Sequence, residues 1–164
     1  SMARAVDSNG GVYFIPAFSG MGAPHWKMDA RAAIVGLTFG SKKNHVVRAA
    51  LEAVAFQIKD VIVAMEKDSG ISLSELKVDG GMTANSFLMQ LIADLLGVKA
   101  VNIGLEEVSA LGAAYMAGLG VGEFKRINDL ASLHYNQKVF EPSEAAEQIQ
   151  ENYNAWQAMI DKHC

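Results

Sequence analysis

Apolar residues recur at three- and four-residue spacing between Val47 and Met65. This spacing places them on one face of a helix, so it predicts a long amphipathic helix in this part of the chain. Asn44 precedes the pattern and is expected to cap the helix, because its short polar side chain can accept a backbone N–H. Ser69 and Gly70 follow the pattern and are expected to end the helix.

Shorter apolar runs, bounded by glycine or other turn residues, predict the remaining elements. We expect strands over residues 11–18, 32–39, 76–79 and 98–103, the second of them buried, and helices over residues 85–96, 110–118 and 143–162. Ser109 is expected to cap the helix over 110–118. The last helix has an apolar stripe of Ile149, Tyr153, Trp156 and Ile160. The order strand, helix, strand, helix in the middle of the chain predicts an α/β layer with parallel strands.

Composition and charge narrow the class of protein. The 164 residues are 51% hydrophobic, enough for one domain with its own core. The net charge of -4, with no block of lysines or arginines, argues against nucleic acid or an anionic membrane as partner. The longest uncharged apolar stretch, residues 108–122, is too short and too rich in glycine to span a bilayer. We therefore expect a soluble protein.

The termini add two further expectations. Cys164 is the single cysteine, so no disulfide can form within the chain and the cytoplasm is the expected compartment. His163 beside it is not expected to form a metal site, because two adjacent residues at a chain end are usually incidental. Residues 1–3 look like the remnant of a cleaved tag, which leaves 4–164 as the folded domain.

A pair of glycines, Gly80 and Gly81, lies between the predicted strand over 76–79 and the next helix. Ligands of α/β folds bind at the carboxyl ends of strands, and glycines lack the side chains that would keep a flat ring or a phosphate away from the backbone. Asn85 could contact such a ligand or cap the helix, and the cap is the commoner role. The spacing matches neither G-x-G-x-x-G nor a P-loop, so without further context it favours a tight turn.

Four segments, in the same order, resemble the FGGY carbohydrate kinases. Residues 78–90 resemble the adenosine motif of that family, and residues 36–57 resemble its second signature. Residues 109–118, SALGAAYMAG, resemble its ALGAAYLAG helix. Residues 16–26, PAFSGMGAPHW, are similar to the glycerol-kinase stretch PAF-[ST]-G-L-G-A-P-Y-W, although His25 and Lys27 stand where tyrosine and aspartate are usual. The likeness covers nearly everything between residues 10 and 122.

The resemblance implies a fold, a reaction and a site. The fold is the actin-like, ribonuclease-H-like ATPase architecture, and residues 4–164 are its C-terminal, nucleotide-binding portion, with an incomplete sheet. The reaction is transfer of phosphate from ATP, with Mg²⁺, to a polyol or sugar, glycerol being the leading substrate and ADP and glycerol 3-phosphate the products. Gly81 and Asn85 fall on positions that contact adenosine, and Gly80 shapes the same turn. The site residues implied are therefore Gly80, Gly81 and Asn85.

The family places its base aspartate, its phosphate-binding turns and its polyol pocket upstream of these motifs. We therefore expect no catalytic residue in this chain, an N-terminal lobe of the same enzyme as partner, and no activity from the chain alone. The carboxylates Asp29, Asp60, Asp68 and Asp94 are expected to be solvated charges. Glu52 is expected to pair with Arg48 one turn away. His45 and His134 are expected at a helix start and in a loop.

Two alternatives remain open from the sequence. A non-catalytic actin-like module could assemble through the apolar faces of residues 110–118 and 149–160, and it would associate without nucleotide. A regulatory ATP-binding module could share the same fold, because one fold hosts many functions. The incomplete sheet that the family resemblance implies would leave an exposed strand edge, which favours self-association, so a homo-oligomer is expected.

Overall fold

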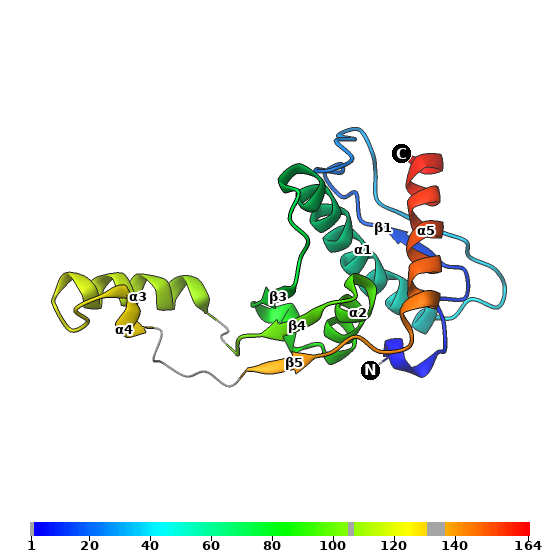
Figure 1. Cartoon of the computed structure of the whole chain (residues 1–164). Helices are drawn as coiled ribbons and strands as arrows, with labels where there is room; N and C mark the ends of the chain where they lie inside the picture. The colour runs from blue at the N-terminus through cyan, green and yellow to red at the C-terminus, as the bar shows by residue number, and fades with distance from the viewer. Residues whose placement is uncertain (1, 105–106, 131–136) are drawn as a thin grey trace.

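Helix α1 (Lys43–Ser69) is the longest element of the fold and lies at its centre (Figure 1). The computed structural model describes residues 2–104, 107–130 and 137–164. Gly70 ends α1 as predicted, with φ of 69° and its N–H donating to the Glu66 carbonyl. The helix begins before Asn44, so the predicted cap is wrong. The His45 imidazole accepts the backbone N–H of Lys42 at 3.1 Å, which satisfies a helix-start donor and confirms the helix-start role of His45.

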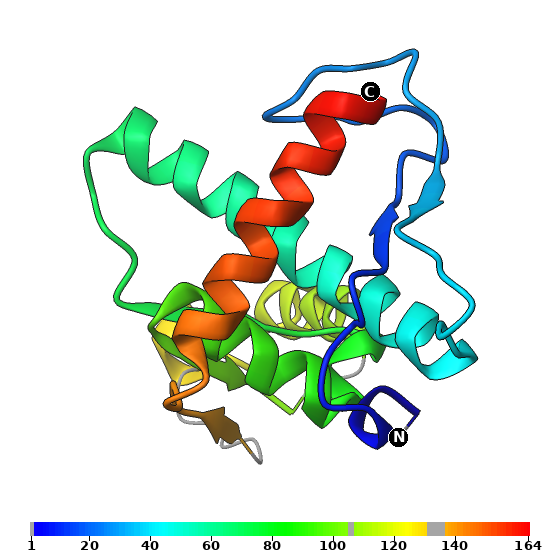
Figure 2. The same ribbon diagram turned by 90° about the vertical axis from the view of Figure 1, so that its right-hand side faces the viewer.

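Helices α2 (Ser86–Leu96) and α5 (Ala146–His163) pack with α1 around the main core, and α5 crosses over α1 (Figure 2). Trp156 is fully buried, with its ring centroid 5.5 Å from that of Phe56. Its indole Nε1–H donates to the Phe14 carbonyl at 2.8 Å, so α5 is also joined to strand β1. The predicted stripe of α5 is confirmed, because all four of its residues are buried.

A three-stranded sheet lies beside α2, in the order β3 (Glu75–Val78), β4 (Lys99–Asn102), β5 (Lys138–Phe140). Strands β3 and β4 are parallel, as predicted, with Val78 opposite Asn102. Their carboxyl ends therefore lie at one edge of the sheet. Strand β5 was not predicted; it pairs antiparallel with β4, with Phe140 opposite Ala100.

The first two strands form a separate antiparallel pair, β1 (Tyr13–Ile15) with β2 (Ala33–Val35). Both are shorter than predicted. The prediction that the second strand is buried is wrong, because Ile34 is 43% exposed. Strand β2 pairs with β1 on one side only, and in the described part of the chain no strand covers its other edge.

Helices α3 (Val108–Gly120) and α4 (Ile127–Leu130) extend to one side of the body (Figure 1). Neither helix has a buried residue. Helix α3 begins before Ser109 and has Glu107 at its N-cap position, so the predicted serine cap is wrong. Within the ranges described, none of the helices has the length and hydropathy needed to cross a membrane.

The short 3-10 helix η1 (Met2–Ala5) opens the chain. Its Ala3 is fully buried and η1 packs on α1, so this short helix contacts the body of the fold. His134 lies outside the described residues.

Candidate functional site

The glycine pair lies at the carboxyl end of β3, where the chain turns sharply. Gly80 has φ of 90°, a conformation that favours glycine, and it precedes a single 3-10 turn, η2 (Gly81–Ala84). Thr83 closes this turn twice, since its N–H and its hydroxyl both donate to the Gly80 carbonyl, at 3.0 and 2.7 Å. The helix therefore starts one turn after the glycines.

Asn85 caps helix α2. Its Oδ1 accepts the backbone N–H groups of Phe87 at 3.1 Å and Leu88 at 3.3 Å, which satisfies two donors of the first turn. The helix-capping role that the sequence favoured for Asn85 is therefore confirmed. A contact between Asn85 and a ligand would have to use the amide nitrogen of the same side chain.

A cavity of about 450 Å³ opens at this edge of the sheet. That volume is in the range of small-molecule sites. The described residues that line it are Gly80, Gly81, Thr83, Ala84, Asn102, Gly104 and Glu107. Two of the three predicted site residues thus lie together in its wall, whereas Asn85, the N-cap of α2, is not among the lining residues. Among these lining residues Glu107 carries the charge, so the cavity offers little attraction to a phosphate.

Asn102, the last residue of β4, was missed by the sequence reasoning. Its Nδ2 donates to the Thr83 carbonyl at 3.3 Å, and its Oδ1 accepts the Gly104 N–H at 2.8 Å. A signal was available, because an Asn-x-Gly sequence follows an apolar strand at 102–104. Recognising it required knowing that β4 lies directly beside β3.

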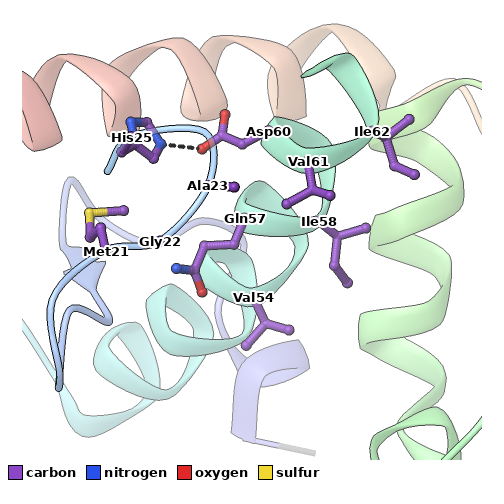
Figure 3. A pocket seen from close by; sticks show the side chains of 10 residues that line it. All are labelled: Met21, Gly22, Ala23, His25, Val54, Gln57, Ile58, Asp60, Val61 and Ile62. Atoms are coloured by element: carbon purple, nitrogen blue, oxygen red, sulfur yellow. Dashed lines mark hydrogen bonds and ion pairs between the residues drawn. The ribbon is translucent and has the colours of Figure 1, made fainter. Parts of the chain in front are cut away.

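Asp60 is buried, with 4% of its surface exposed, so the prediction that it is a solvated charge is wrong. One carboxylate oxygen, Oδ2, lies 2.7 Å from His25 Nε2 (Figure 3). The other, Oδ1, accepts from the Tyr153 hydroxyl at 2.5 Å and from Gln157 Nε2 at 3.1 Å. Burial is the largest cause of a raised pKa of Tyr153, and the bond to Asp60 raises this pKa further. The cluster joins α1, α5 and the segment before β2.

A second cavity, of about 430 Å³, lies beside this cluster (Figure 3). Apolar side chains such as Met21, Val54 and Ile58 form much of its wall. Its ionisable groups, His25 and Asp60, are hydrogen-bonded to each other and so are already satisfied. The cavity beside the glycine pair instead exposes glycine backbone at the ends of parallel strands, so we take that cavity as the candidate site.

The other carboxylates serve the fold or remain in solvent. Asp94 is also buried, against prediction, because its Oδ1 accepts from Gln90 Nε2 at 2.9 Å and from the Ser143 N–H at 2.7 Å. Asp29 and Asp68 are exposed, as predicted.

The predicted pair of Arg48 with Glu52 is confirmed at 2.9 Å, and Asn9 donates to the same carboxylate at 2.9 Å. Glu52 is 2% exposed, and this burial raises the pKa of its carboxyl group. Through its bond with Asn9, Glu52 links α1 to the N-terminal segment.

Known proteins are similar in sequence to nearly the whole of this chain. The chain is 49% identical over 161 residues to a glycerol kinase of Alkaliphilus oremlandii and 50% identical over 161 residues to one of Saccharopolyspora erythraea. Each match covers 98% of this chain and 32% of the relative, so the chain spans about a third of the length of these kinases. Nothing in these matches favours a non-catalytic assembly or regulatory module.

Solved structures agree on the fold. A Plasmodium falciparum glycerol kinase, described as crystallised with ADP, superposes with a TM-score of 0.85 at 35% identity, over 99% of this chain and 32% of that one. A xylulose kinase of Lactobacillus acidophilus superposes with a TM-score of 0.82 at 23% identity, over 98% of this chain and 33% of that one, which supports the fold alone. Residues 1–121 match the C-terminal domain of the FGGY family of carbohydrate kinases. The chain therefore belongs to the FGGY family of carbohydrate kinases.

Proposed function

We propose that this chain is the C-terminal, adenine-nucleotide-binding part of an ATP-dependent glycerol kinase, which converts ATP and glycerol to ADP and glycerol 3-phosphate. The observation that carries the proposal is the cavity at the carboxyl ends of β3 and β4, walled by Gly80 and Gly81. The similarity to glycerol kinases over 98% of the chain supports this substrate. His25, in place of the usual tyrosine, bonds to Asp60 and so serves the fold here.

The adenosine would lie against the glycine turn. An added Cβ at Gly81 would meet no protein atom within 4 Å, so the space beside this residue is open. A flat base can approach backbone that has no side chain in front of it. The acidic side chain of Glu107 in the wall disfavours phosphate there, so we place the nucleoside in the cavity and the phosphates outside it. Asn85 would add a contact through its amide nitrogen.

We propose no catalytic residue and no metal ligand in this chain. Bound Mg²⁺ would neutralise charge on the β- and γ-phosphates of ATP, and a carboxylate must accept the proton of the glycerol hydroxyl. The buried carboxylates Glu52, Asp60 and Asp94 are each held by protein donors. Phosphoryl transfer would therefore depend on an N-terminal lobe, which would supply the base, the phosphate donors and the glycerol site.

The test is a titration of the isotope-labelled chain with Mg-ATP, followed through the amide signals of Gly80, Gly81 and Asn85. We expect saturable shifts at these signals with a dissociation constant of roughly 1 mM, about 4 kcal/mol, because the phosphate donors are absent. Gly81→Val should abolish the shifts of the Gly80 and Asn85 signals, because its added side chain would occupy the open space beside the turn where we place the base.

Gly120→Val is the matched control, since Gly120 also faces open space but lies at the far end of α3. Both variants should retain the wild-type thermal midpoint. If Gly81→Val binds ATP as wild type does, or if wild type shows no saturable shift, the proposed site is wrong.

We also propose a cytoplasmic location, because the single cysteine excludes a disulfide within the chain. Self-association is proposed through β3, which lies at the outer edge of its sheet among the described strands. Light scattering that finds only monomer at every protein concentration would contradict the second proposal.

A further inference from the structure

We infer that Asn102 is a positioning residue of the nucleotide cavity, whose side-chain amide holds the two walls of the cavity at a fixed separation. The inference rests on the proposed function and adds a residue to that same site. Asn102 ends β4 directly opposite Val78 at the end of β3, so its side chain starts between the two segments that leave the sheet. The Ile103 N–H donates to the Val78 carbonyl at 3.2 Å and continues this pairing by one residue.

One half of the amide reaches the glycine turn. Asn102 Nδ2 donates to the Thr83 carbonyl at 3.3 Å. The two bonds that Thr83 donates go to Gly80 within the same turn, so they shape the turn without attaching it to the sheet. None of the residues of η2 is buried, so packing contributes little to holding the turn in place. The bond from Asn102 therefore fixes the turn against β4.

The other half of the amide holds the opposite wall. Asn102 Oδ1 accepts the Gly104 N–H at 2.8 Å, where the chain leaves β4 with a Gly104 φ of 75°. Gly104 and Gly80 both line the cavity, on the two segments that the amide joins. An amide can do this because it carries a donor and an acceptor on one planar group. A carboxylate in its place keeps the bond from Gly104 and loses the bond to Thr83.

Loss of the bond to Thr83 should weaken nucleoside binding. An unattached turn must be ordered when the ligand binds, and that cost is subtracted from affinity. A typical hydrogen bond of this kind corresponds to about a tenfold change in an equilibrium constant. We therefore expect Asn102→Asp to raise the dissociation constant of adenosine about tenfold and to leave the fold intact.

The experiment uses the chain itself and adenosine as probe. Adenosine has no phosphate, so the added carboxylate cannot act through simple repulsion of a charged ligand. The control is Asn154→Asp, the same chemical change at an exposed position on α5. Three quantities are measured for wild type and both variants: the dissociation constant of adenosine by amide shifts, the thermal midpoint, and the hydrogen-exchange rate of the Thr83 amide.

We expect Asn102→Asp to bind about tenfold more weakly, with faster exchange at Thr83 and an unchanged midpoint, and Asn154→Asp to behave as wild type. Equal adenosine affinity in wild type and Asn102→Asp would overturn the positioning role and leave the proposed function standing. A lowered midpoint with unchanged exchange at Thr83 would also overturn it, because the residue would then act on the whole fold. Absence of adenosine binding by wild type would overturn both.

Discussion

Replacing the buried Asp60 with alanine should cost this chain a large part of its stability. Asp60 accepts hydrogen bonds from His25, Tyr153 and Gln157, and it is 4% exposed. Asp60→Ala leaves all three donors without this acceptor. The three donors come from the segment before β2 and from α5, so the change removes hydrogen bonds that link both to α1.

The magnitude follows from the number and kind of bonds lost. Hydrogen bonds to a charged group contribute about 1.5–3 kcal/mol each, and removal of one partner of a buried charged cluster costs about 3–5 kcal/mol. We therefore expect Asp60→Ala to lower the free energy of unfolding by about 3–5 kcal/mol. Asp60→Asn keeps one acceptor oxygen for Tyr153 and Gln157 and loses the charge, so its loss should be smaller, about 1.5–3 kcal/mol.

Urea unfolding followed by tryptophan fluorescence is the appropriate assay, because the fully buried Trp156 packs beside the cluster. Asp68→Ala is the control, since Asp68 belongs to the same helix and is exposed. A surface substitution of this kind changes stability by about 0.5 kcal/mol or less. If Asp60→Ala is destabilised no more than Asp68→Ala, the cluster does not contribute to stability as argued.

Two further substitutions test other parts of the fold. Gly36 has φ of 79°, and a Cβ there would collide with the Gly11 carbonyl. Gly36→Ala should therefore lower the free energy of unfolding by about 2 kcal/mol or more, as measured by urea unfolding. A loss below about 0.5 kcal/mol would refute this prediction. Burial raises the pKa of Glu52 above its ordinary value of 4.5, so the stability of wild type relative to Glu52→Gln should be greatest below pH 4.5 and fall as pH rises through the folded pKa. The measurement is the urea midpoint of both proteins between about pH 4 and 8. An advantage of wild type over Glu52→Gln that increased with pH would contradict this prediction.

The sequence predicted those features that short-range patterns determine. The stripe of α5 and the glycine ends of α1 and α2 depend on spacing and on a single residue type, and all are present. The cap at Asn44 failed because His45 supplies an alternative acceptor for the helix start. The helix therefore begins after Lys42, whose N–H is accepted by a side chain three positions later, and not after Asn44 as the general preference for asparagine predicts.

Features that depend on contacts between distant segments were not predictable in the same way. Asp60 looks like any charge on a helix until residues 25, 153 and 157 are brought beside it. Strand β5 has three residues and is defined by its pairing with β4 rather than by its own pattern. Asn102 belongs to the site because β4 lies next to β3, which the order of elements along the chain does not state.

The distribution of burial explains why the site needs a device such as Asn102. The buried aromatic side chains Phe56, Tyr153 and Trp156 gather where α1 and α5 meet. In contrast, η2, which contributes to the cavity wall, contains no buried residue, and neither does α3, which follows Glu107 of that wall. Segments with few buried contacts open locally at low free-energy cost, and binding sites are commonly built from such segments. Glycines in a cavity wall let a ligand approach the backbone closely, but they have no side chains whose packing would hold the wall in place. Hydrogen bonds from Asn102, at the end of β4, then provide the order that side-chain packing provides in the core.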